Sequence, residues 1–237
     1  MQTTLHKADT RGSADHGWLS TFHSFSFADY YDPQRMGFGA LRVLNDDIIA
    51  AGNGFGTHPH SNMEIITTVL EGELAHADSM GTKEVIRTGE VQVMSAGSGV
   101  KHSEFNNSEN MPVTLLQIWI EPNRQNVAPR YDQKKFTVKD RHNALQLIIS
   151  PYQMGGPLWI HQNAWVYMGS LDATVSVTHT LHAKENGVYI FVISGSVQVG
   201  EQILEARDGY GVWDTESVNI AAVTNAEVLI LEVPIVV

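Results

Sequence analysis

The stretch that decides the fold begins at Gly52 and reads GNGFGTHPHSNMEIITTVLEGEL up to Leu74. It places His58 and His60 two residues apart, and an apolar run bounded by glycine follows. On an extended strand, residues i and i+2 point to the same face, with side chains roughly 7 Å apart at their roots. Two imidazoles at this spacing can therefore converge on one ion.

A second stretch, MSAGSGVKHSEFN from Met94 to Asn106, repeats this spacing with His102 and Glu104. Two such pairs on adjacent or facing strands would give a set of three histidines and one carboxylate. Nitrogen and carboxylate ligands without thiolate suit Fe, Mn, Ni, Co, Cu or Zn. A barrel interior can leave a coordination position open for water, oxygen or substrate, which is typical of a catalytic metal site.

The composition limits the classes of protein to which the chain can belong. Of 237 residues, 43% are hydrophobic and 17% charged, as in globular proteins with a core. A net charge of −11 repels phosphate backbones and acidic membrane surfaces, so we expect neither direct nucleic-acid binding nor membrane binding. The absence of cysteine excludes disulfides and thiolate metal sites. Without an apolar span or an apolar N-terminal signal, we expect a cytoplasmic protein.

Short runs rich in Val, Ile, Leu and Thr recur along the chain and are bounded by Gly, Asn, Asp or Pro. Such runs include 65–70, 91–95, 114–120, 145–150, 188–194 and 228–233. Their length and punctuation are typical of strands in an all-β sandwich or barrel. No long stretch has a convincing 3.6-residue apolar period. The sequence therefore predicts an all-β fold with little helix, apart from a short piece near 32–36.

The two halves of the chain share a rhythm that indicates an internal duplication. VLEGELAHADSMGTKEVIRTGEVQVM, from Val69, and VISGSVQVGEQILEARDGYGVWD, from Val192, both read as strand, Gly, strand, turn, strand, Gly turn and strand. The polar segment 121–143 between the halves contains two prolines and most of the local charge, and we interpret it as a connector with a strand in its middle. We expect a metal-binding domain over 1–130 and a second domain without metal over 131–237.

The paired motifs resemble the cupin superfamily of small metal-binding β-barrels. The wider sequence is similar to the pirin family, which includes bacterial pirin-like quercetin 2,3-dioxygenases. The matching blocks are HSFSFADYYDP (His23–Pro33), MGFGALRVLNDD (Met36–Asp47), GFGTHPHSNMEI (Gly54–Ile65), VLEGELAHADSMG (Val69–Gly81), MSAGSGVKHSEFN (Met94–Asn106) and QIWIEP (Gln117–Pro122). This resemblance implies two cupin (jelly-roll) β-barrel domains packed together, with metal in the N-terminal barrel only.

The resemblance also implies the ligands of that metal. Carried over residue by residue, they are His58, His60, His102 and Glu104. We expect one divalent transition metal per chain and favour Fe(II), with Ni, Co, Mn, Cu and Zn as alternatives. Glu104 is also the candidate catalytic base, because it is the only carboxylate expected to contact the metal. Glu64 stands one place before the usual cupin glutamate, so we expect a structural role or a place beside the ligands.

The C-terminal half lacks this set of ligands. His179 and His182 fall near the equivalent strand but are three residues apart, so on a strand they would face opposite sides. No later pair of histidine and carboxylate follows Gly209. We therefore expect no metal in the second barrel.

Other residues have two readings each. His23, His76 and His161 could lie beside the ligands or contact substrate, although surface or hydrogen-bonded histidines are the ordinary alternative. An aromatic-rich stretch either packs the domains together or forms the wall of a pocket for a flat ligand, and it contains Phe25, Phe27, Tyr30, Tyr31 and Phe38.

The resemblance implies a metal-dependent dioxygenase that opens the central ring of flavonols such as quercetin and releases carbon monoxide. Its substrates would be the flavonol and dioxygen. One alternative is a metal-binding pirin-type regulatory protein that acts through protein partners. Another is a cupin enzyme that uses the same site on a different small aromatic or carbonyl substrate.

Overall fold

The computed structural model describes residues 1–153 and 155–236. Within these residues the regular structure consists of strands and two short 3-10 helices, η1 (Ala8–Thr10) and η2 (Val138–Arg141). The all-β prediction is confirmed, but the helix expected near 32–36 is wrong. That segment is a turn in which the Asp32 carboxylate accepts a hydrogen bond of 2.9 Å from the backbone N–H of Gln34. No helix in the described ranges has the length and apolar character needed to cross a membrane.

The first barrel consists of a seven-stranded and a four-stranded sheet that face each other. The large sheet has the strand order β12 (Arg130–Lys135), β9 (Glu90–Ser95), β6 (Glu64–Glu71), β11 (Val113–Ile120), β4 (Leu41–Ile49), β3 (Leu19–His23) and β2 (Gly12–Asp15). The small sheet has the order β5 (Gly54–His60), β10 (Val100–Asn106), β7 (Glu73–Asp78) and β8 (Lys83–Arg87). The strands of this barrel pair antiparallel throughout, as in a jelly roll.

The second barrel repeats this plan. Its large sheet has the order β1 (Gln2–His6), β20 (Gly209–Trp213), β17 (Asn186–Ser194), β22 (Ala226–Pro234), β15 (Trp165–Leu171), β13 (Leu145–Ser150) and β14 (Leu158–Trp159). Its small sheet has the order β16 (Ser176–Thr180), β21 (Ser217–Ala222), β18 (Val197–Val199) and β19 (Gln202–Leu204). Each sheet of one barrel thus has a counterpart of the same size in the other.

Small irregularities of the backbone recur at matching places and support the predicted duplication. The register of β6 against β11 shifts just before Gly72, and the register of β17 against β22 shifts just before Gly195. Both glycines have positive φ, 84° and 74°, a conformation that disfavours other residues. A side chain at either glycine would also collide with a backbone carbonyl.

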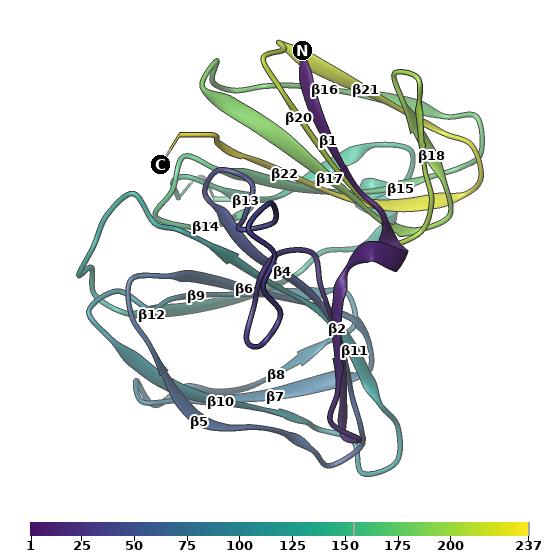
Figure 1. Cartoon of the computed structure of the whole chain (residues 1–237). Helices are drawn as coiled ribbons and strands as arrows, with labels where there is room; N and C mark the ends of the chain where they lie inside the picture. The colour runs from purple at the N-terminus through teal and green to yellow at the C-terminus, as the bar shows by residue number, and fades with distance from the viewer. Residues whose placement is uncertain (154, 237) are drawn as a thin grey trace.

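The two barrels exchange their edge strands. β1, at the start of the chain, pairs with β20 of the second barrel, and β12, in the connector, pairs with β9 of the first (Figure 1). The predicted strand in the middle of the connector is therefore β12. The predicted boundary between 130 and 131 falls at the first residue of this strand. The large sheet of the second barrel is thus completed by β1, which precedes the first barrel in the chain. The large sheet of the first barrel is completed by β12, which precedes the rest of the second barrel.

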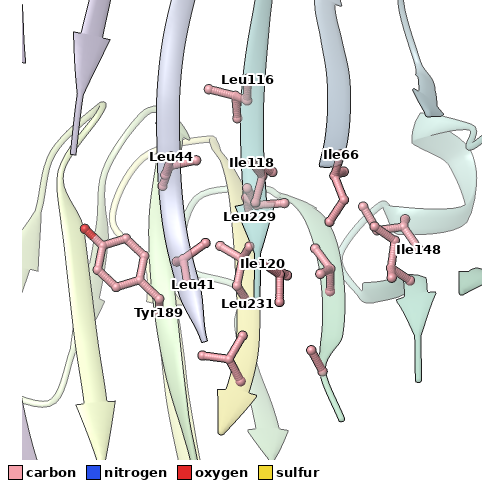
Figure 2. Packing of buried hydrophobic residues seen from close by; sticks show 14 of the residues in the cluster. Leu41, Leu44, Ile66, Leu116, Ile118, Ile120, Ile148, Tyr189, Leu229 and Leu231 are labelled. Atoms are coloured by element: carbon pink, nitrogen blue, oxygen red, sulfur yellow. The ribbon is translucent and has the colours of Figure 1, made fainter. Parts of the chain in front are cut away.

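The largest apolar cluster lies between the two large sheets rather than inside either barrel (Figure 2). Leu44 and Ile118 from the first barrel pack there with Leu229 from the second. Residues alternate along each strand, so the opposite faces of the same strands point into the barrels. An ion pair between Asp46 and Arg207, 2.9 Å apart, joins the barrels at the edge of this cluster.

Candidate metal centre

The three predicted histidine ligands meet inside the first barrel. His58 lies directly opposite His102 across the β5–β10 pair, and His60 lies opposite Val100. Their ring centroids are 4.4 to 4.9 Å apart, and their nearest ligand nitrogens all lie within 4.8 Å of one another. Pro59 causes no loss of pairing, because β5 is the edge strand of its sheet. The i, i+2 spacing therefore places these side chains as predicted.

The histidine nitrogens are in the state that a metal requires. Burial, together with the neighbouring His58, lowers the pKa of His60 to about 4. Burial and then the neighbouring His58 and His60 lower the pKa of His102 to about 3. The Nδ1 atom of His58 lies 2.8 Å from the carbonyl oxygen of Gly56, which can only accept, so Nδ1–H donates and Nε2 is the nitrogen left to face an ion. The imidazoles of His60 and His102 are therefore neutral near pH 7 and able to bind a metal.

Unpaired buried nitrogens give the strongest indication that an ion belongs at this place. His102 is 1% exposed, and neither of its ring nitrogens has a hydrogen-bond partner among the described residues. The same holds for Nδ1 of His76 and Nε1 of Trp119. Buried polar atoms without partners are rare, and each calls for an explanation such as an ion. A three-nitrogen donor set without thiolate fits a first-row transition metal.

Glu104 is buried on β10 but groups with different neighbours. Its carboxylate oxygens lie within 4.8 Å of ligand atoms of His102 and His76, not of all three clustered histidines. Thr67 and Gln117 donate hydrogen bonds of 3.4 and 3.3 Å to it. Burial, followed by the nearby Asp47 carboxylate, raises the pKa of Glu104 to about 7. His102 thus belongs to two groups of possible metal ligands, one with His58 and His60 and one with His76 and Glu104.

His76 and Glu64 both have hydrogen-bond partners. His76 is buried, lies 3.0 Å from Asp78 through Nε2, and packs against the Tyr131 ring. The ring centroids of His76 and His102 are 5.4 Å apart, so the two imidazoles are neighbours. Glu64 accepts a hydrogen bond of 2.7 Å from Ser95, and burial raises its pKa to about 7. Glu64 belongs to none of the ligand groups found in the described ranges, as expected for a structural role.

A cavity of about 570 Å³ opens beside the histidines, and His58, His60 and Glu104 line it. Its aromatic wall consists of Phe27, Tyr30, Phe55 and Trp119. The Trp119 ring stands edge-on to the His60 ring, with centroids 5.0 Å apart. Its polar wall comes from β3 and β4 and includes Thr21, His23, Asn45 and Asp47. A flat aromatic molecule with polar groups suits these surroundings.

The aromatic stretch serves both roles that the sequence left open. Phe27 and Tyr30 line the cavity. Phe25 and Phe38 pack into the cluster between the barrels, and Tyr31 is 72% exposed. Of the other histidines, His23 lies in the cavity wall, whereas His161 packs against Trp159 elsewhere.

The second barrel holds a cluster that the sequence reasoning missed. His179 and His182 do not face opposite sides, because β16 ends at Thr180 and His182 lies in the bend that follows it. Nε2 of His179 and Nδ1 of His182 each lie 2.8 Å from the same carboxylate oxygen of Glu232. Burial alone would raise the pKa of Glu232, but hydrogen bonds from His179, His182 and Asn186 together lower it to about 2.

This second cluster differs from the first in that both oxygens of its carboxylate are hydrogen-bonded. Both oxygens of Glu232 accept hydrogen bonds, since the side chain of Asn186 and the backbone N–H of His182 each donate at 2.7 Å to the oxygen that the rings leave free. Donors therefore surround the carboxylate, and an ion held by these three residues, whose ligand atoms lie within 4.8 Å of one another, would have to displace the hydrogen bonds of both rings. The arrangement accounts for a buried charge without a metal.

Comparison with known proteins identifies the family. The Pirin family matches residues 4–120, and the Quercetinase C-terminal cupin domain matches residues 147–233. The quercetin 2,3-dioxygenase of Escherichia coli (strain K12) is 47% identical over 230 residues, which are 97% of this chain and 98% of that protein. The chain belongs to the pirin family. A pirin-like protein of Caulobacter vibrioides is 43% identical over 225 residues, which are 94% of this chain and 96% of that protein.

Solved pirin structures agree with this assignment. The bacterial pirin YhhW from Escherichia coli, in complex with nickel(II), is 45% identical, and the match covers 99% of this chain and 100% of that chain with a TM-score of 0.94. The predicted family and the fold of two cupin domains are thereby confirmed. A metal-binding site in this chain accords with its clustered histidines and with the nickel complex of its relative.

Several polar residues of the cavity had no place in the sequence reasoning. Asn45, Asp47 and Gln117 all point into the first barrel. A signal existed for the first two, because they interrupt the apolar strand LRVLNDDII at alternate positions. A strand that is otherwise apolar on this face does not place polar groups there without partners or a function.

Proposed function

We propose that this pirin is a metal-dependent dioxygenase that opens the central ring of flavonols such as quercetin and releases carbon monoxide. The observation that carries the proposal is the cluster of His58, His60 and His102, with unpaired nitrogens, at the side of an aromatic cavity. The name of the Escherichia coli relative, quercetin 2,3-dioxygenase, supports this substrate class.

Four side chains would hold the metal: His58, His60, His102 and Glu104. We propose one divalent transition metal per chain and Fe(II) as the native ion, while Ni, Co, Mn, Cu and Zn suit the same donors. Nickel(II) in the Escherichia coli pirin supports a metal of this class. When bound, the metal supplies a Lewis acid that favours the anion of a hydroxyl group at the site.

Glu104 is the proposed catalytic base. A flavonol has an acidic hydroxyl next to a carbonyl, and a carboxylate oxygen of Glu104 would take the proton from that hydroxyl oxygen. A divalent cation beside Glu104 would favour its carboxylate form, which is the form that a base requires near neutral pH. The donors of Thr67 and Gln117 keep the carboxylate in its orientation toward the cavity.

The aromatic wall would hold the flat rings and exclude water. Phe27 and Trp119 pack edge-on with ring centroids 5.4 Å apart, and Phe55 closes the same wall beside His58. Water displaced from this wall by the bound rings would strengthen the electrostatic interactions made beside them. Dioxygen is the second substrate in this proposal.

We also propose that only one of the two domains binds a metal, as expected from the sequence. Residues 1–130 are the proposed metal-binding domain and residues 131–237 the proposed domain without metal, with the edge strands β1 and β12 exchanged between them. The saturated hydrogen bonds of Glu232 support the second statement. The net charge of −11 supports our proposal that the protein does not bind nucleic acid directly, and the lack of cysteine accords with a cytoplasmic location.

The direct test follows quercetin by its visible absorbance in air and under anaerobic conditions, with headspace analysis for carbon monoxide. Protein purified without chelators or affinity tags is first analysed for metals. The proposal expects metal near one equivalent, oxygen-dependent loss of quercetin and carbon monoxide in step with it. No consumption with any of Fe, Mn, Co, Ni or Cu would overturn it, and the regulatory alternative would take its place.

A further inference from the structure

Four buried residues on β3 and β4 form a square of polar side chains in the cavity wall. Thr21 lies directly opposite Asp47, and His23 lies directly opposite Asn45. Alternate residues share a face, so all four side chains point into the first barrel. Each is at most 5% exposed, and each lines the cavity that His58, His60 and Glu104 also line.

Hydrogen bonds inside the square determine which of its donor and acceptor atoms remain available to a molecule in the cavity. Burial lowers the pKa of His23, so its ring is neutral near pH 7. Nδ1 of His23 lies 2.9 Å from Oδ1 of Asn45 and donates to it, which leaves Nε2 as an acceptor. The hydroxyl of Thr21 donates to Oδ1 of Asp47.

Three polar atoms of the square remain without a partner among the described residues: Nε2 of His23, Nδ2 of Asn45 and Oδ2 of Asp47. None of them belongs to the unpaired atoms that are sealed inside the protein, so they are open to the cavity. Burial raises the pKa of Asp47 to about 7, so in its ionised form the square provides an acceptor, a donor and a second acceptor side by side. This combination matches a phenolic hydroxyl, which both donates and accepts.

The surroundings of His23 hold its ring in place. Phe27 lies 5.3 Å from it and Tyr30 lies 6.4 Å from it in a nearly parallel orientation. Both aromatic residues line the same cavity. A planar ring that contacts them would thus present its edge, where hydroxyl groups are attached, to the atoms of the square.

We propose that His23, Asn45 and Asp47 form a second recognition subsite that binds a ring hydroxyl of the flavonol other than the hydroxyl next to the carbonyl. This inference rests on the proposed function, because it assigns the substrate's second anchor within the same cavity. Nε2 of His23 accepts from the hydroxyl, Nδ2 of Asn45 donates to its oxygen, and Oδ2 of Asp47 accepts from a neighbouring hydroxyl. The subsite makes the enzyme selective for polyhydroxylated flavonols.

A substrate without this second hydroxyl would leave these buried groups unpaired. Sites that hydrogen-bond a substrate hydroxyl reject the analogue that lacks it, because their own polar groups then lose their partners. We expect the parent protein to favour quercetin over 3-hydroxyflavone, which has no other hydroxyl, by at least about tenfold in kcat/KM. Galangin, with hydroxyls on the fused ring only, and kaempferol, with one more on the pendant ring, identify the ring that the subsite contacts.

The test compares these four flavonols in the parent, His23→Phe and Asn45→Ala. Phenylalanine keeps the ring packed against Phe27 and Tyr30 but has no acceptor. Both variants should lose about tenfold in kcat/KM for quercetin and change less than about twofold for 3-hydroxyflavone. Tyr167→Phe, at the position of the second barrel that corresponds to Asn45, is the control and should change neither. Metal content should match the parent in all variants.

Dissociation constants from quenching of tryptophan fluorescence provide a readout that does not need turnover. Equal losses for quercetin and 3-hydroxyflavone would mean a structural role and would overturn the subsite, as would a parent that binds both flavonols equally tightly. If quercetin binds in a hydroxyl-dependent way but is not consumed, the dioxygenase proposal fails and the subsite stands. If no flavonol binds, both fail.

Discussion

The two barrels share a backbone plan but fill their interiors in opposite ways. In the first barrel, one row of directly paired residues crosses six strands and is polar throughout: His23, Asn45, Gln117, Thr67, Gln92 and Gln133. The corresponding row of the second barrel is Leu147, Tyr167, Ile230, Ile190, Tyr210 and Leu5. One fold thus supports a cavity with polar walls and a closed hydrophobic core.

The same comparison holds for the ligand positions. By strand register, His179 stands where the first barrel has His58, because it lies opposite Val218 as His58 lies opposite His102. Val218 and Ile220 replace His102 and Glu104, and both belong to the apolar core of the second barrel. The remaining His179 hydrogen-bonds to Glu232. A histidine at a ligand position therefore does not by itself indicate a metal site. Its hydrogen-bond partners decide whether a ring nitrogen is available to bind an ion.

The largest expected effect separates the two clusters by metal content. A His58→Ala, His102→Ala double variant removes two of three clustered nitrogens, so metal should fall from about one equivalent to near none, and turnover should fall with it. The His179→Ala, His182→Ala double variant is the matched control and should keep both. Elemental analysis of protein purified without chelators measures this. Full retention in the first variant, or loss in the second, would reverse the assignment of the two barrels.

The next effect concerns chemistry without loss of the site. Glu104→Gln keeps the shape of the side chain but removes the proton acceptor, and its amide nitrogen can no longer accept one of the two hydrogen bonds that Thr67 and Gln117 donate. We expect a loss of about 10²- to 10⁴-fold in kcat with quercetin, while part of the metal is retained. Flavonol bound to the variant should be mainly protonated, which its absorption spectrum reports. Parent-like turnover with unchanged pH dependence would mean that Glu104 is not the base.

The features that the sequence predicted correctly are those that depend on local spacing. His58 and His60 lie two apart on one strand, so alternation alone brings them together. The glycines at 72 and 195 end their strands in the same way, so the repeat was visible from turn residues. Family resemblance added the two-cupin fold, which no local pattern specifies.

The features that escaped prediction depend on pairing between distant segments. The polar row of the first barrel exists only because six strands align in register, and Asn45 alone is an isolated polar residue in the sequence. The exchange of β1 depends on its pairing with β20 near the other end of the chain. His182 meets Glu232 because it lies beyond the end of β16, where strand alternation no longer applies.

A smaller effect concerns the stability of the second barrel at low pH. Glu232 has a pKa of about 2 in the folded protein, against 4.5 ordinarily, so the folded state favours its charged form. This contribution is fully present above about pH 4.5 and is lost as the pH falls through about 2; we expect roughly 1–3 kcal/mol. Glu232→Gln should lose this contribution, so its free energy of unfolding should fall less than the parent's between pH 7 and pH 3.

Urea denaturation at the two pH values measures this difference. Glu201→Gln, at an exposed position of the same barrel, is the control and should follow the parent. If the parent and Glu232→Gln lost the same free energy on acidification, the cluster would not be the charge-stabilised network inferred from its hydrogen bonds. The contrast with the unpaired histidines of the first barrel would then weaken.

The smallest expected effect lies in the polar row itself. Gln92 is fully buried, and neither atom of its amide has a partner among the described residues. It does not line the cavity, and its counterpart in the second barrel is Tyr210. Gln92→Leu should therefore raise the free energy of unfolding by about 1 kcal/mol and leave metal content unchanged. Gln198→Leu, at an exposed position, should change it by less than about 0.5 kcal/mol.

A destabilised Gln92→Leu would mean that the amide is hydrogen-bonded in solution. The polar row would then increase the free energy of unfolding of the first barrel instead of decreasing it. The two interiors would then differ in their polar and apolar side chains but not in whether those side chains stabilise the fold.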